Sequence, residues 1–72
     1  MIEVGNSYIF RYRVKLDDET KAENEMCIRN DGLECDAICE KFADKHGTVY
    51  EVESCLGDTF FAYECELDEI KK

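Results

Sequence analysis

The chain has 72 residues and carries 18 acidic against nine basic side chains, which gives a formal net charge of −9 at pH 7. A chain of this length forms one domain, residues 1–72, whose small core leaves no room for a deep active-site cleft. The excess of carboxylates repels nucleic acid and anionic lipid, so it favours a protein partner with a basic surface, although good solvation alone also explains such a charge.

Residues 8–16 alternate between two kinds of side chain. One face carries Tyr8, Phe10, Tyr12, Val14 and Leu16, and the other carries Ile9, Arg11, Arg13 and Lys15. A period of two with aromatic and β-branched residues is typical of a half-buried strand, so the sequence predicts a strand here. The polar, acidic residues 17–25 then predict a turn or loop, and residues 26–28 predict a short strand that pairs back on the first.

Residues 31–46 predict an amphipathic helix. Asp31 is suited to cap its first amides, and Glu34 follows at the spacing of a capping box. The apolar face is spaced at i, i+3, i+4, i+7 and i+11 and consists of Cys35, Ile38, Cys39, Phe42 and His46. Gly47 stands where a left-handed residue ends many helices.

Residues 48–55 and 59–67 predict a hairpin around the turn at 56–58. In the first strand, Tyr50 and Val52 are expected to face the core. In the second strand the expected inward residues are Phe61, Tyr63, Cys65 and Leu67. Phe60, Ala62 and Val49 would then form an apolar spot on the outward face with Ile9. The charged residues 68–72 are expected to fray.

Together these elements predict an α+β fold, a small antiparallel β-sheet with one α-helix packed across one face, in the order ββαββ or βαββ. The basic residues of the first strand are expected to lie beside the outward glutamates of the hairpin, because opposite charges on neighbouring strands stabilise their pairing. The predicted helix and the loop before it would then carry the net negative charge.

Acidic residues recur every fourth position along the predicted helix. On a helix this spacing places carboxylates about 6 Å apart, which is similar to the spacing of phosphates along a nucleic-acid strand. We therefore predict a partner-binding surface that mimics nucleic acid, while an ordinary solvated helix face gives the same pattern. Its residues are Asp36, Glu40 and Asp44, together with Asp17, Asp18, Glu19 and Glu23 of the loop.

The five cysteines are odd in number, so they cannot all form intramolecular disulfides, and we expect them to pack as small hydrophobic residues. Cys35 and Cys39, one helical turn apart, suggest a metal site with Cys55, Cys65 or His46 as an alternative, but the Cys-x-x-Cys spacing of zinc sites is absent. We predict no cofactor. The single histidine has no catalytic motif around it, so we predict that the protein is not an enzyme.

The sequence contains no apolar run of the length of a membrane span and no charged leader followed by an apolar stretch, so we expect a cytoplasmic protein.

Three segments carry a resemblance to a known family: residues 37–43 (AICEKFA), residues 46–49 (HGTV), and Glu53, Gly57 and residues 61–63 (FAY). They resemble the helix–Gly-Thr-Val–hairpin block of small phage-encoded anti-CRISPR proteins and cover less than half of the chain. The family members bind through a basic surface, whereas this chain is acidic, so no functional residue is transferred.

The resemblance implies a phage or mobile-element inhibitor, which with this charge would occupy a basic nucleic-acid-binding surface of its target. One alternative is a generic bacterial protein-interaction or regulatory module, including a homodimer formed through a sheet edge or through the face of Phe60. The other alternative is a cysteine-based metal-binding module.

Overall fold

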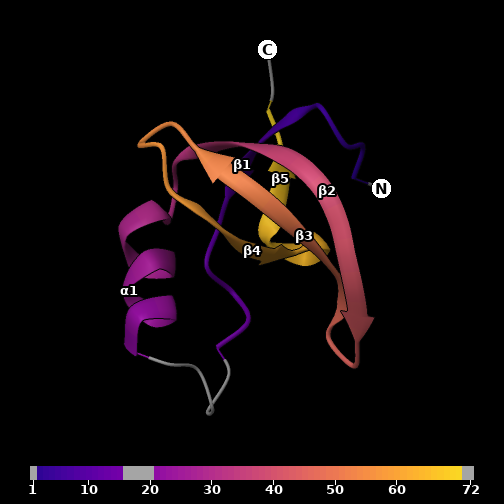
Figure 1. Cartoon of the computed structure of the whole chain (residues 1–72), viewed down its shortest axis with the longest axis horizontal. Coiled ribbons are helices and arrows are strands. Elements are labelled where there is room, and N and C mark those ends of the chain that lie inside the picture. Colours follow the sequence, from indigo (N-terminus) through magenta and orange to yellow (C-terminus); the bar gives the residue numbers. More distant parts are fainter. Residues whose placement is uncertain (1, 16–20, 71–72) are drawn as a thin grey trace.

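The computed structural model describes residues 2–15 and 21–70. Five antiparallel strands form one sheet in the order β4-β3-β2-β1-β5, with one α-helix between β1 and β2 (Figure 1). The elements are β1 (Ser7–Phe10), α1 (Lys21–Asn30), β2 (Glu34–Asp44), β3 (Gly47–Ser54), β4 (Thr59–Tyr63), the short 3-10 helix η1 (Glu64–Glu66) and β5 (Leu67–Glu69). The predicted antiparallel sheet with one helix is therefore confirmed, whereas the chain order is βαββββ, which neither predicted order describes.

Strand β2 is the longest and links the two parts of the sheet, because it pairs with β1 through its first residues and with β3 along most of its length. The pairing with β3 shifts register between Ala37 and Cys39 and again between Glu40 and Phe42. Such bulges bend a strand and increase its twist. Figure 1 shows β2 curving over the rest of the sheet.

The core lies on one face of this curved sheet. Its buried members are Ile2, Tyr8, Phe10, Cys27, Cys35, Ala37, Tyr50, Val52, Phe60, Ala62 and Leu67. The rings of Phe10 and Phe60 meet edge to face, with centroids 4.9 Å apart. From α1, Cys27 belongs to the cluster and Met26 packs against it. The predicted inward faces of Tyr8 and Phe10, and of Tyr50 and Val52, are thus confirmed.

The helix predicted over residues 31–46 is wrong, because residues 34–44 form strand β2. Asp31 does not cap a helix: its Oδ1 accepts the amide of Tyr12 at 3.0 Å. Gly32 supplies the left-handed φ of +84° that the turn into β2 requires. Gly47, with φ of +119°, begins β3 after the hairpin turn. Non-local pairing with β1 and β3 has overridden the local helical spacing.

The strand predicted for residues 26–28 is also wrong, because they lie in helix α1. The predicted loop 17–25 is helical from Lys21 onward, and its residues 17–20 lie outside the described part of the chain. The segment is rich in residues that favour a helix. One side of the helix faces the interior: Cys27 belongs to the core cluster, Met26 packs against it, and Asn30 is buried.

The facing predicted for the last strand is reversed. Phe60 and Ala62 are 9% and 1% exposed and belong to the core, whereas Phe61 is 53% exposed. The register explains this result, because Phe60 pairs with Val52 and Ala62 with Tyr50, and cross-strand partners share a face. The apolar spot predicted around Phe60 therefore does not exist.

Strand β4 ends at Tyr63, short of the predicted Leu67, and the turn of η1 then brings β5 beside β1. Part of the segment expected to fray, Asp68 and Glu69, is paired in this way. The neighbours of β1 are β2 and β5, so Arg13 forms its ion pair with Asp68 and not with a glutamate of the hairpin.

Candidate functional site

The outward face of the sheet, opposite the core, carries exposed acids at one end and exposed aromatic rings at the other. The register places Ser7, Asp36, Glu53 and Thr59 in one row across the strands. The next rows are Cys39, Glu51 and Phe61, then Phe42, Val49 and Tyr63. We call Glu34, Asp36, Glu53, Phe42 and Phe61 the acidic–aromatic face, because all five are exposed.

The acidic end of this face contains like charges placed opposite one another. Asp36 pairs directly with Glu53 across the β2–β3 ladder, and its Oδ1 accepts the hydroxyl of Ser7 at 2.5 Å. Within residues 2–15 and 21–70, no ion pair with a basic side chain is seen for Glu34, Asp36 or Glu53. Like charges directly opposite in a sheet repel, so this end holds an uncompensated negative charge.

The neighbouring outward carboxylate is compensated. Glu51 Oε1 lies 3.1 Å from Lys41 Nζ, and this contact raises the pKa of Lys41. The contrast with Asp36 and Glu53 shows that the charge of the outward face is uneven along the strands.

The aromatic end combines exposed and buried rings. Phe42 and Phe61 are 52% and 53% exposed, while Val49 and Tyr63 between them are buried on the same face. Val49 and Tyr63 do not belong to the main core cluster. The outward face therefore has an apolar base of its own, on which two phenylalanine rings remain accessible.

The turn of the β2–β3 hairpin borders the aromatic end and fixes Tyr63. The Tyr63 hydroxyl donates to Asp44 Oδ2 at 2.5 Å, and the backbone amide of His46 donates to Asp44 Oδ1 at 2.8 Å. These hydrogen bonds lower the pKa of Asp44, and that from Tyr63 has the larger effect. The His46 ring meets the Tyr63 ring edge to face at 5.6 Å. Asp44 is thus engaged in holding the turn.

A second polar cluster joins η1 to the segment that follows β1. The Arg13 guanidinium donates two hydrogen bonds to Asp68, at 2.9 and 2.7 Å, which lower the pKa of that carboxyl. The Glu66 carboxylate is 3% exposed and accepts the backbone amides of Arg13, Val14 and Tyr63, each at 3.0 Å. Its hydrogen bonds go to the backbone of this chain, so its role is structural.

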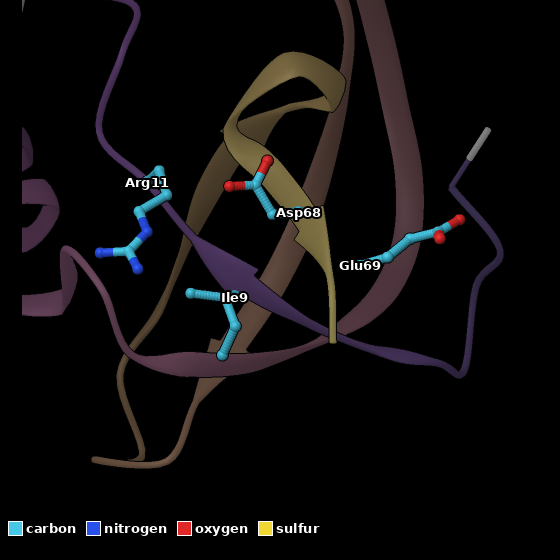
Figure 2. Close-up of a pocket in the computed structure, with 4 residues that line it drawn as sticks. All are labelled: Ile9, Arg11, Asp68 and Glu69. Atoms are coloured by element: carbon cyan, nitrogen blue, oxygen red, sulfur yellow. The ribbon is translucent and has the colours of Figure 1, made fainter. Parts of the chain in front are cut away.

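An open depression of about 540 Å³ lies where β1 meets β5. It is lined by Ile9, Arg11, Asp68 and Glu69, whose side chains are drawn in Figure 2. A single cationic side chain stands there beside two carboxylates, and Asp68 is already paired with Arg13. The charges do not favour any one class of ligand, so we do not assign a site to this depression.

The predicted acidic stripe has no counterpart in the structure. Asp36, Glu40 and Asp44 lie along strand β2, where four residues span about 13 Å and not the roughly 6 Å of a helical turn. Asp36 faces outward with Glu53, whereas Glu40 pairs with Tyr50 of the core face and Asp44 lies at the hairpin turn. Glu23 is in α1, and Asp17, Asp18 and Glu19 lie outside the described residues.

Sequence reasoning missed most of the acidic–aromatic face. The sequence predicts Glu34 in a capping box, Phe42 on the buried side of a helix and Phe61 facing inward, whereas all three are exposed. Glu53 is one of the hairpin glutamates expected to face outward, and it is exposed. The alternation of Glu34, Cys35, Asp36 and Ala37 is the signal that favoured a strand.

The cysteines do not converge on a metal site. None of the five is in a disulfide, and Cys35 faces the core while Cys39 lies opposite Glu51 on the outward face. Within the described parts of the chain, no group of three or more histidine, cysteine, aspartate or glutamate side chains is placed to hold a metal ion.

Burial predicts three classes of thiol reactivity. Cys55 and Cys65 are exposed, Cys39 is half-buried, and Cys27 and Cys35 are buried, with burial raising the pKa of the Cys35 thiol to about 11. Because the thiolate is the nucleophile, a disulfide reagent at pH 8 should label Cys55 and Cys65 fast, Cys39 more slowly, and Cys27 and Cys35 only after denaturant is added. Cys55→Ser and Cys65→Ser should each remove one thiol from the fast phase of labelling. Fast labelling of Cys35 would contradict the fold.

The chain matches no model of a protein family, no curated protein and no solved structure. The one described α-helix, α1, has ten residues and is too short and too polar to cross a membrane.

Proposed function

We propose that this protein is a small binding module whose acidic–aromatic face docks on a basic surface of a nucleic-acid-binding protein. The observation that carries the proposal is the direct pairing of Asp36 with Glu53, both exposed and without a basic partner among the described residues. The net charge of −9 adds long-range attraction to such a target.

The energetics support a partner at this position. Like charges directly opposite in a sheet cost about 0.2–1 kcal/mol, and a lysine or arginine brought between Asp36 and Glu53 would relieve that repulsion. Phe42 and Phe61 supply exposed aromatic area next to the charges, and aromatic side chains often dominate the binding energy of an interface. The opposite charges of the two proteins accelerate their encounter, and the two phenylalanine rings add affinity once they are in contact.

The finer proposal is an inhibitor of the anti-CRISPR type, encoded by a phage or mobile element, that blocks nucleic-acid binding by occupying the target's basic surface. It is supported by the small size, the charge and the sequence resemblance. Residues 37–43 of the resembling block belong to strand β2, so the proposal relies on the sheet face and not on a shared helix.

A pair of matched charge reversals tests the proposal. Asp36→Lys with Glu53→Lys should weaken binding to a CRISPR effector at least about tenfold, because it changes an attractive contact into a repulsive one. The control is Glu40→Lys with Glu69→Lys, which changes the net charge by the same amount. Both residues are exposed but lie away from the acidic–aromatic face, because Glu40 pairs with Tyr50 and Glu69 with Tyr8 of the core face. The control should bind the effector within about twofold of the unchanged protein.

The measurement is binding of the effector in a pull-down and by calorimetry at two salt concentrations, together with the effector's cleavage of target DNA. We expect inhibition by the unchanged protein and by the control, weaker at high salt. Equal loss in both double variants would show that only net charge matters, and an effector that is neither bound nor inhibited would refute the anti-CRISPR version.

A further inference from the structure

We propose that the free edge of β4 receives an extended basic segment of the partner as a sixth strand of the sheet. This inference rests on the proposed function and specifies how the partner is bound. Its basis is the hydrogen-bonding direction of the β4 backbone together with the composition of the edge.

The ladder between β3 and β4 determines which backbone groups point outward. The amide of Ser54 donates to the carbonyl of Asp58 at 2.8 Å, and hydrogen-bonded pairs in an antiparallel ladder recur at every second residue. Phe60 and Ala62 therefore bind β3, whereas the amides of Thr59, Phe61 and Tyr63 point away from it. The amide of Tyr63 does so, since it donates to Glu66 Oε1.

No described strand pairs with that side of β4, which is an edge strand of the sheet. Helix α1 reaches β4 from the core side, since Cys27 shares a cluster with Phe60 and Ala62. The backbone of Thr59 and Phe61 thus presents donors and acceptors at an edge that the described part of the chain leaves unpaired.

The two edges of the sheet differ in their protection against pairing. Strand β5 has three residues, two of which are Asp68 and Glu69. Strand β4 has five residues, Thr-Phe-Phe-Ala-Tyr, with neither charge nor proline. Charges, proline and short length are the usual means by which proteins prevent strand addition at an edge, and β4 has none of them.

The charge of the surroundings selects the occupant. A second copy also carries −9, so two such edges meet with overall repulsion. On the outward face, the side chains of an added strand would lie beside Phe61. Glu53 would be two strand spacings away, about 10 Å, so the long side chain of a lysine on the added strand would extend toward its carboxylate. On the inward side it lies beside Phe60 and Ala62. These neighbours favour a segment that alternates basic and apolar residues.

The experiment uses a capped peptide of about eight residues in which lysine and valine alternate, added to the isotope-labelled full chain. Without peptide, the amides of Thr59 and Phe61 should exchange hydrogen fast while those of Phe60 and Ala62 are protected. With peptide, Thr59 and Phe61 should become protected at least about tenfold. N-methylation of one alternate set of peptide amides should abolish binding, and methylation of the other set should not.

Further variants separate this inference from the proposed function. Thr59→Pro removes an edge amide and should abolish peptide binding, while Thr59→Val keeps the amide and should bind normally. If the peptide binds but Thr59 and Phe61 stay unprotected, and Asp36→Lys with Glu53→Lys abolishes that binding, the edge inference fails and the proposed function stands. No binding of the peptide, equal effects of both methylation patterns, or a homodimer through β4 in sedimentation would also refute it.

Discussion

Replacing Glu66 by alanine is expected to lower the free energy of unfolding by about 3 kcal/mol, because the buried carboxylate accepts hydrogen bonds from three backbone amides. A domain of 72 residues has a total stability of roughly 4–11 kcal/mol, so the variant should be close to unfolding. Urea unfolding followed by far-ultraviolet circular dichroism measures the change.

Two variants make the Glu66 result specific. Glu66→Gln keeps one oxygen acceptor but turns an amide group toward a backbone donor, so its loss should be about half as large. Glu64→Ala removes the same charge from the same short helix, where the Glu64 side chain has no hydrogen bond to another described residue, and should stay within about 0.5 kcal/mol of the unchanged protein. Equal destabilisation by Glu64→Ala and Glu66→Ala would mean that charge, and not the three hydrogen bonds, matters.

Replacing Asn30 by aspartate is expected to cost about 3 kcal/mol although the side-chain shape hardly changes. Asn30 is fully buried, and its Nδ2 donates to the Met26 carbonyl at 2.9 Å and to Asp58 Oδ2 at 3.0 Å. An aspartate would bring a second carboxylate against Asp58 and remove both donors, leaving an unpaired buried charge. Thermal and urea unfolding at pH 7 should show the loss.

A double-variant cycle identifies the cause of that loss. Asn30→Asp combined with Asp58→Asn restores a donor opposite an acceptor, so part of the stability should return. Asn24→Asp adds the same charge to the same helix and keeps the oxygen that accepts the Tyr12 hydroxyl, so its effect should be small. If the double variant is as unstable as the sum of the single ones, the contact between Asn30 and Asp58 does not explain the cost.

A period of two predicted strands only in part. The strand predicted over residues 8–16 is found only over Ser7–Phe10, and the strand predicted over residues 48–55 is found over Gly47–Ser54, both with the expected inward residues. The same period over residues 59–67 predicted a strand but the wrong inward face. The sheet with one helix followed from the same signals, but the helix was assigned to the wrong segment. A polar segment such as 21–30 has only a narrow buried side, so its helical period is weak.

Strand β2 shows why the candidate site could not be read from the sequence. Its first bulge reverses the alternation, so that Cys39 faces outward with Glu51 and Glu40 faces inward with Tyr50, and its second bulge reverses the alternation again before Phe42. The carboxylates that share a face, Asp36 and Glu53, come from different strands and are brought together only by the register. The outward direction of Phe61 likewise depends on a pairing that no local pattern encodes.

The pairing of β1 with β5 also bears on how the protein is made. Tyr8 pairs with Glu69, so the two strands come from nearly opposite ends of the 72 residues. During synthesis at the ribosome, the residues of β1 leave the exit tunnel long before those of β5. Contacts between residues so far apart in the sequence form slowly. The sheet is therefore completed only after translation has passed β5, and a nascent chain stalled before Leu67 should remain sensitive to protease.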